Sequence, residues 1–317
     1  MRTEAAALAL VLGATAVVAA HGQTFPTRPV RIVTTAPGAA NDLFARMIAQ
    51  GLTDSFGTQV IVDNRGGGLL AIETAARATP DGYTLLLYSN GLWTLPLVQK
   101  VSYDAVRDFA PVSLVGRQPN VLVVHPSLPV SSVKDLVALA KSKPGQLNYG
   151  SGSTGSTPHI AAELFKHQAG IDVVRVNYKG AGPALVALVA GEVQLMFPTA
   201  GSAAAHVKSG KLKALAVTSA QPSSLAPGLP TVAAAGLPGY ESVAPFGIFA
   251  PAGTPNAIVQ RLSDEIAKVV NRPEVKRRFL DNGVEVVASS PQELAATIKA
   301  DTTRLTKLVN EAGLRGK

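Results

Sequence analysis

The sequence predicts an α/β protein in which short apolar strands alternate with amphipathic helices. Residues 30–34 form a strand candidate that leads through a loop of small residues into a helix, and residues 147–149 lead into a second loop and helix of the same kind. This alternation favours parallel βαβ units. The 317 residues are enough for two domains. A composition with 47% hydrophobic but only 5% aromatic residues suits compact packing of small side chains.

The remaining elements follow in order along the chain. Short apolar runs bounded by turn residues predict strands at residues 59–63, 83–88, 120–124, 173–178, 193–197 and 212–218. Residues 243–250 are apolar and return the chain toward its first domain. Two capping boxes, Ser132 with Asp135 and Ser290 with Glu293, predict helix starts near the middle and the end of the chain.

The chain is organised around residues 149–159, where a strand candidate runs into a loop of Gly, Ser and Thr. We expect Thr157 to cap the next helix, Pro158 to occupy its first position and Gly170 to end it. Small residues let the backbone approach a ligand, and the free N–H groups and positive dipole end of a helix attract an anion. The stretch therefore predicts half of a carboxylate-binding site, with a tight turn that binds nothing as the alternative.

The same stretch also matches the dinucleotide-binding fingerprint G-x-G-x-x-G at Gly150, Gly152 and Gly155. That site needs an acidic residue about 20 positions further on to hold the ribose. Residues 174–180 contain no acid, and Pro158 puts the helix start after the third glycine. We therefore do not expect a nicotinamide cofactor, and an oxidoreductase remains only a weak alternative.

Three further strand ends carry small polar loops before a helix, at residues 36–42, 179–183 and 198–202. Asn41 or Asp42 is expected to cap the helix after the first of them. Four such loops would place many N–H donors around one crevice, although short loops before helices are generally rich in these residues.

Two residues near another strand end are also candidates for ligand contact. Asn90 and Trp93 follow the strand at residues 83–88, and the carboxyl ends of strands are where ligands collect in open α/β sheets. Trp93 is the only tryptophan. It forms either a stacking wall for a ligand or part of the core.

Composition excludes several classes of function. With no cysteine, disulfides and thiolate chemistry are absent, and the five histidines have no metal-ligand spacing. The formal net charge of +8 comes from scattered Lys and Arg without interleaved aromatics, so we expect no nucleic-acid partner. No G-x-S-x-G motif indicates a hydrolase.

The N-terminus predicts export. Residues 5–20 are apolar but short for a membrane span, and small residues precede Gln23. We expect residues 1–22 to be a signal peptide and the protein to reach the periplasm, without a cysteine for a lipid anchor.

Short motifs run in order over almost the whole chain, including Ala36-Pro-Gly-Ala-Ala-Asn-Asp42, Asn64-Arg-Gly66, Pro80-Asp-Gly-Tyr-Thr84, Gly155-Ser-Thr-Pro-His159, Tyr178-Lys-Gly180 and Ala250-Pro-Ala-Gly-Thr-Pro255. Each is weak alone, but together they resemble the receptors of tripartite tricarboxylate transporters, the Bug/TctC-type solute-binding proteins. The resemblance implies a type II-like periplasmic-binding-protein fold with two lobes, each a mostly parallel sheet flanked by helices, and a ligand cleft between them. Lobe 1 would comprise residues 23–120 and 250–317, and lobe 2 residues 121–249.

The resemblance also implies a monomeric receptor, not an enzyme, that needs no cofactor or metal and hands a small carboxylate to integral-membrane transporter subunits. A receptor that presents its ligand to a signalling partner is an alternative. Loops from both lobes would hold the ligand by N–H groups, hydroxyls and waters. The expected ligand-binding residues are Thr35, Pro37, Gly38, Ala39, Ala40, Asn41, Asp42, Asn90, Trp93, Ser151, Gly152, Ser153, Thr154, Gly155, Ser156, Thr157, His159, Tyr178 and Thr199.

Several of these residues have a second interpretation. The hydroxyl residues of the 151–157 loop could only form the turn, His159 could only pack, and Asp42 fits a loop-ordering cap better than a ligand group, because like charges repel an anion. Lys179 is the one cation near a predicted strand end.

Pro198 stands where the family commonly has an aspartate, which favours a mono- or dicarboxylate with an apolar body over an amino acid.

Overall fold

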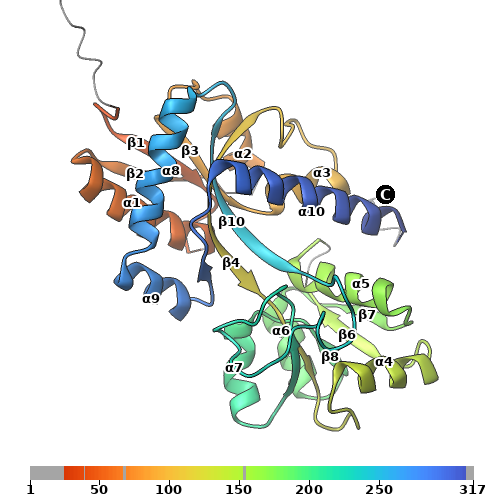
Figure 1. Ribbon diagram of the computed structural model, residues 1–317. Coiled ribbons are helices and arrows are strands. Elements are labelled where there is room, and N and C mark those ends of the chain that lie inside the picture. Colours follow the sequence, from red (N-terminus) through yellow and green to blue (C-terminus); the bar gives the residue numbers. More distant parts are fainter. Residues whose placement is uncertain (1–24, 39, 67–68, 153–154, 312–317) are drawn as a thin grey trace, which may run out of the picture.

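The computed structural model describes residues 25–38, 40–66, 69–152 and 155–311 and shows two α/β lobes, each built on one sheet (Figure 1). The two-lobed α/β fold expected from the sequence is confirmed. The expected signal peptide lies outside the described residues. The lobe boundaries at residues 120 and 250 stay a prediction.

The first lobe contains a six-stranded sheet. Its strands are β1 (Val30–Thr34), β2 (Val60–Asn64), β3 (Thr84–Ser89), β4 (Phe109–Pro119), β10 (Val243–Pro251) and β11 (Glu285–Val286). They lie in the order β11-β4-β10-β3-β1-β2. β1 pairs in parallel with β2 and β3, whereas β10 is antiparallel to β3 and β4, and β11 to β4. The carboxyl ends of β1, β2 and β3 therefore meet at one edge.

The second lobe contains a five-stranded sheet. Its strands are β5 (Val121–Val124), β6 (Asn148–Ser151), β7 (Val174–Asn177), β8 (Leu195–Met196) and β9 (Lys213–Val217). They lie in the order β7-β6-β8-β5-β9. β6 is parallel to β7 and β8, while β5 is antiparallel to β8 and β9. Each sheet is thus mixed, and the expectation of mostly parallel sheets is wrong. The strands that precede the small-residue loops are parallel to each other, and the strands that join the lobes are antiparallel to their neighbours.

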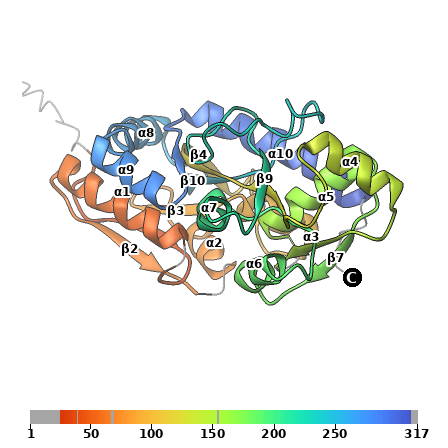
Figure 2. The same ribbon diagram turned by 90° about the horizontal axis from the view of Figure 1, so that it is seen from below.

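Helices cover both faces of each sheet (Figures 1 and 2). They are α1 (Ala40–Phe56), α2 (Leu69–Ala76), α3 (Gly91–Val98), α4 (Val133–Ser142), α5 (Thr157–Ala169), α6 (Ala181–Val189), α7 (Ala200–Lys208), α8 (Asn256–Val270), α9 (Pro273–Asp281) and α10 (Pro291–Glu311). The predicted capping box of Ser290 and Glu293 forms reciprocally. The box of Ser132 and Asp135 forms in part: Ser132 Oγ accepts from Asp135 N, whereas the Asp135 carboxylate accepts from Ser131 N. None of the described helices is both long and apolar enough to span a bilayer.

Two local expectations at the start of α5 are wrong. Ser156 is the N-cap residue and Thr157 is the first helical residue, so Pro158 occupies the second position. The shift is small because Pro is tolerated throughout the first helical turn, where backbone N–H groups have no intrahelical partner. Gly170 ends the helix in the left-handed conformation, with φ of 60°, as predicted.

α10 connects the cores of the two lobes. Leu294 and Ile298 pack into the first lobe with Trp93 and Phe249, whereas Leu305 and Leu308 pack into the core of the second lobe. Burial of each leucine side chain contributes roughly 1.5–3 kcal/mol. The helix therefore runs along both lobes, as Figure 1 shows at its upper right.

The chain crosses between the sheets twice, after β4 and before β10, and hydrogen bonds tie these crossings together. Asn120 N donates to Thr218 Oγ1 over 2.8 Å, and Thr218 N donates to the Asn120 carbonyl over 2.9 Å. Ser242 N then donates to the Thr218 carbonyl over 2.9 Å. Asn120 and Thr218 are both fully buried. The junction is thus a small hydrogen-bonded ladder between the lobes.

Candidate ligand-binding site

The first half of the candidate site lies at the edge where β1, β2 and β3 end. It consists of the β1 loop, residues 35–42, beside Asn64 at the end of β2 and Asn90 after β3. Thr34 Oγ1 donates to the Leu87 carbonyl over 3.0 Å and joins β1 to β3 just before the loop. Ala39, one of the expected binding residues, lies outside the described residues.

Asp42 orders the β1 loop. One carboxylate oxygen accepts from Gly38 N over 2.8 Å, and the other accepts from Asn64 Nδ2 over 2.8 Å and pairs with Arg46 Nε over 2.9 Å. Asn64 Nδ2 also donates to the Thr35 carbonyl over 2.8 Å. The α1 start is thereby tied to β2, and Pro37, Gly38 and Ala40 remain exposed.

The electrostatics of Asp42 agree with this structural role. Burial raises its pKa, but hydrogen bonds from Asn64, Gly38 and Arg46 outweigh the burial, so the pKa lies below its ordinary value. The carboxylate is ionised at neutral pH and its charge is compensated by Arg46. The expectation that Asn41 or Asp42 is the N-cap residue is wrong, because α1 already begins at Ala40. Asp42 instead orders the loop from within the first helical turn, and both its oxygens are already occupied.

The second half of the candidate site lies at the edge where β6, β7 and β8 end. It consists of the β6 loop, residues 151–159, with Tyr178 after β7 and Thr199 after β8. Tyr178 N donates to the Ser151 carbonyl over 2.9 Å. Ser153 and Thr154, both expected to bind ligand, lie outside the described residues.

Glycine is required twice in the β6 loop. Gly155 has φ of +80°, a left-handed conformation that L side chains rarely adopt. At Gly152, a Cβ atom would lie 3.1 Å from the Gly180 carbonyl carbon and 3.2 Å from Ala181 N, so two backbone segments pass in close contact. The loop after β6 and the start of α6 are packed against each other at this point.

His159 is buried, 1% exposed, and is held as a neutral side chain. Its Nδ1 accepts from Gly155 N over 3.1 Å, so the ring proton of the neutral form is on Nε2. Burial and the nearby Arg175 guanidinium lower its pKa to about 4. Nε2 has no hydrogen-bond partner among the described residues. The sequence alone leaves contact and packing open, and in the described part of the chain the ring presents a buried donor without an acceptor.

Arg175 places a cation at the β6 loop that was not among the residues expected from the sequence. Its Nε donates to Ser151 Oγ over 2.8 Å, and its Nη2 donates to the Gly152 carbonyl over 2.7 Å. Lys179, the cation named instead, is exposed. The parallel register that pairs Arg175 with Tyr149 and Asn177 with Ser151 puts the guanidinium over the loop. Because side chains alternate along a strand, the sequence puts Arg175 and Asn177 on the same face of β7. The sequence alone does not specify the register of β7 against β6, which is needed to place Arg175 at the loop.

Four other expected binding residues also have contacts within their own lobe, and their part in ligand binding stays a prediction. Trp93 is 2% exposed, packs against Phe249 and donates from Nε1 to Asp301 over 3.3 Å, which favours the core interpretation over a ligand wall. Thr199 caps α7, accepting from Ser202 N. Asn90 caps α3 without a side-chain hydrogen bond. The Tyr178 side chain packs on the apolar cluster beneath α6 and α7.

Buried polar atoms without partners gather in the two loops. Among the described residues, nine buried side-chain atoms lack a hydrogen bond, and four of them belong to Thr35 and Asn41 in the β1 loop and Ser156 and His159 in the β6 loop. Native proteins satisfy most buried polar groups, so such atoms are candidates for hydrogen bonds to an ordered water or a ligand. The two loops therefore have unused hydrogen-bonding capacity.

A small cavity of about 50 Å³ borders the β6 loop and joins the two lobes. It lies between Gly155 and Ile160 of the second lobe, Leu95 and Leu97 of α3, and Leu305 of α10. The β6 loop thus faces the first lobe. A pocket that both loops share stays a prediction. The described residues contain no cluster of His, Asp or Glu suited to a metal ion.

Comparisons with known proteins agree with this fold. A family model described as the tripartite tricarboxylate transporter family receptor, TctC, matches residues 44–314. Protein BugT of Bordetella pertussis is 35% identical over 312 residues, which are 96% of each chain. The chain is also similar to Rpa4515 of R. palustris, whose structure was solved with adipate. The two are 35% identical with a TM-score of 0.74, and the match covers 92% of this chain and 100% of Rpa4515. A further similar structure is MatC from Rhodopseudomonas palustris, solved with bound malate. It is 30% identical with a TM-score of 0.70, and the match covers 90% of this chain and 100% of MatC.

Proposed function

Because this chain belongs to the tripartite tricarboxylate transporter receptor family, we propose that its β1 and β6 loops together hold one small carboxylate for delivery to the membrane subunits of such a transporter. The similar proteins solved with adipate and with malate each hold a dicarboxylate. Both loops stand at the N-terminal ends of helices, which favour anions.

The observation that carries the proposal is the set of buried, unpartnered polar atoms in the two loops. Thr35 and Ser156 offer hydroxyl groups, and His159 offers a neutral Nε2–H donor. A carboxylate, directly or through ordered water, would accept hydrogen bonds from such groups. Arg175 adds a positive charge beside the β6 loop, and the charge of Asp42 is compensated within its own lobe.

The ligand class is a mono- or dicarboxylate with an apolar body. Pro198, at the end of β8, supplies no carboxylate, and the Asp42 oxygens are occupied by Gly38, Asn64 and Arg46. An ammonium group on the ligand would therefore be buried without a compensating anion, which costs free energy.

The ligand is bound without being converted. Nδ1 of His159 already accepts from Gly155 N, so this nitrogen is not available to activate a serine hydroxyl. We further propose that the protein acts in the periplasm as a monomer after removal of its signal peptide.

Titration of the purified protein with four C6 compounds tests the proposal. Adipate should bind and raise the melting temperature, since a ligand at 100 times its Kd stabilises by about 2.7 kcal/mol. Adipamide, which has the same chain without charge, and lysine should give no shift, and 2-aminoadipate should bind much more weakly than adipate. No shift with adipate, malate or any other acid of a broad panel, or loss of the acid on prolonged incubation followed by NMR, would end the proposal.

A further inference from the structure

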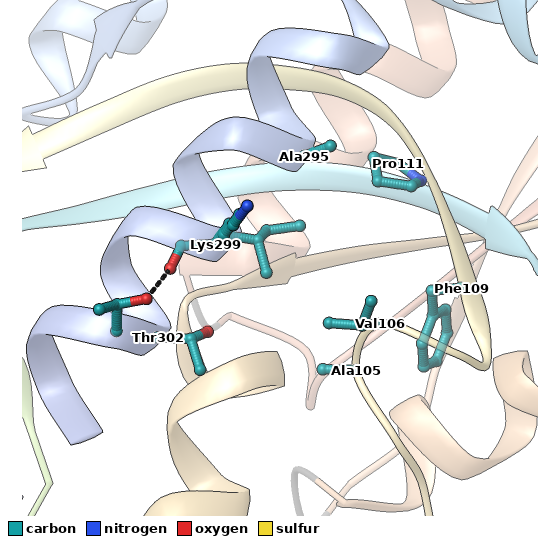
Figure 3. A pocket seen from close by; sticks show the side chains of 9 residues that line it. Ala105, Val106, Phe109, Pro111, Ala295, Lys299 and Thr302 are labelled. Atoms are coloured by element: carbon teal, nitrogen blue, oxygen red, sulfur yellow. Dashed lines mark hydrogen bonds between the residues drawn. The ribbon is translucent and has the colours of Figure 1, made fainter.

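A second cavity, distant in sequence from both loops, lies in the first lobe between α10 and the segment that leads into β4. Its volume is about 440 Å³, within the range of about 300–1,000 Å³ typical of small-molecule pockets. Figure 3 shows it between Lys299 and Thr302 on α10 and Ala105, Val106 and Phe109 on the opposite side. None of its lining residues belongs to the β1 or β6 loop.

The walls of this cavity, here named the α10 pocket, are mainly apolar. Phe109 and Pro111 line it from β4, and Ala295 and Ile298 line it from α10. Val106 stands at its rim with 73% of its surface exposed. Apolar walls next to an exposed valine favour an occupant with an apolar body.

The exposed valine is held in place by its own turn. Asp104 Oδ1 accepts hydrogen bonds from Val106 N over 2.9 Å and from Arg107 N over 2.8 Å, and Asp104 N donates to Asp108 Oδ2 over 2.8 Å. The turn is therefore ordered by several local hydrogen bonds. The carboxylates of Asp104 and Asp108 are used in the turn and do not line the pocket.

Two polar groups on α10 are available to an occupant. Thr302 Oγ1 is buried and has no hydrogen-bond partner among the described residues. Lys299, one helical turn earlier, is exposed and forms no ion pair in the described part of the chain. The neighbouring Thr303 Oγ1 is satisfied, because it donates to the Lys299 carbonyl over 2.9 Å. One cation and one hydroxyl thus stand beside an otherwise apolar cavity.

We propose that the α10 pocket is a second binding site, for an amphipathic organic acid that has an apolar chain or ring and a single carboxylate. The apolar body lies against Phe109 and Ile298, and the carboxylate accepts from Lys299 Nζ and Thr302 Oγ1. A monocarboxylate with an apolar body also falls within the class proposed for the loops, so the two sites are distinguished by their lining residues and not by ligand class. An occupant contacts the helix that packs into both lobes.

Octanoate and octanol are suitable probes, because they share a chain and differ in the carboxylate. In calorimetric titrations with the loops saturated by adipate, the wild-type protein should bind octanoate more tightly than octanol. Lys299→Met should weaken octanoate binding by about three- to fivefold, the loss expected for one solvent-exposed ion pair, and leave octanol binding unchanged. Lys307→Met, an exposed lysine on the same helix outside the pocket, is the matched control and should change neither.

Ala295→Trp tests the pocket itself. Its side chain should fill the cavity and weaken octanoate binding more than tenfold, while adipate binding at the loops is unchanged. Photolabelling of the wild-type protein with a diazirine analogue of octanoate, followed by peptide mass spectrometry, is independent of how that variant folds. Labels should fall on residues 105–111 and 295–303. Labels only elsewhere, or no measurable octanoate binding, overturn the proposal whatever the outcome for adipate.

Discussion

Gly155 donates its backbone N–H to Nδ1 of His159 over 3.1 Å, a bond that closes the β6 loop onto the first turn of α5. The β1 loop repeats this arrangement, because Gly38 N donates to the carboxylate of Asp42 over 2.8 Å. Both glycines have φ of +80°, and both acceptors lie four residues further on. The two lobes thus brace their loops in the same way, and these two N–H groups are used internally instead of pointing at a ligand.

The first prediction concerns the two braced glycines. Gly155→Ala and Gly38→Ala should each cost about 1–2 kcal/mol of stability, because alanine is disfavoured in the left-handed region, and should weaken carboxylate binding at least tenfold. Gly170→Ala and Gly57→Ala are matched controls: both glycines have positive φ and open space around the position of a Cβ, but both lie at helix C-termini.

The four variants are compared by denaturant unfolding and by adipate titration. Similar losses of stability in all four, with loss of binding confined to Gly155 and Gly38, would match the proposed site. If the helix-end variants lost binding equally, the effect would be general destabilisation and the loops would have no special role.

The second prediction distinguishes the two cations near the β6 loop. Arg175→Met removes the donors to Ser151 Oγ and the Gly152 carbonyl and should lower adipate affinity at least tenfold. Arg175→Lys retains the charge without the planar fork and should give an intermediate loss. Lys179→Met removes an exposed charge and should change affinity less than threefold. A larger loss at Lys179 than at Arg175 would reverse the assignment.

The third prediction concerns the pH dependence of stability. The pKa of His159 is about 4 in the folded protein against 6.5 for the free side chain. Between these values the unfolded chain binds a proton that the folded protein does not, so the free energy of unfolding falls as pH falls from 6.5 toward 4. The full shift corresponds to up to about 3 kcal/mol.

His159→Asn keeps an acceptor for Gly155 N and does not titrate. Urea unfolding at several pH values should show a weaker decline below pH 6.5 for the variant than for the wild type. The two proteins differ in no other ionisable group, so the difference between their curves reports on His159. Parallel curves for the two proteins would mean that His159 does not have the depressed pKa.

Local sequence signals predicted the parts of the fold that depend on neighbouring residues. The caps at Ser132 and Ser290, the helix end at Gly170 and the small-residue loops after β1 and β6 all involve residues only a few positions apart. Such contacts follow from the chemistry of short segments. The positions of both loops at strand ends could therefore be read from the sequence.

Contacts between distant segments could not be read in this way. Trp93 donates to Asp301, which is 208 positions away, and only that pairing decides between a core residue and a ligand wall. Arg175 lies over the β6 loop because of the β6–β7 register, which a single sequence does not specify. The long strand β4 was missed because its interior contains Pro111 and Gly116, residues that usually argue against a strand.

The last prediction concerns the junction between the lobes. Thr218 Oγ1 donates to the Asn120 carbonyl over 2.9 Å and accepts from Asn120 N over 2.8 Å. Thr218→Val keeps the shape of the side chain but leaves the buried Asn120 N–H without a partner, which should cost about 1–3 kcal/mol. Hydrogen exchange at Asn120 and Ser242 should accelerate, because the ladder that joins the crossings is weakened.

Thr297→Val is the control, because it removes only a bond from Oγ1 to the Glu293 carbonyl within α10. Its free energy of unfolding should stay within about 0.5 kcal/mol of the wild-type value. Equal stability and exchange in the two variants would show that the Asn120–Thr218 pair does not hold the lobes together.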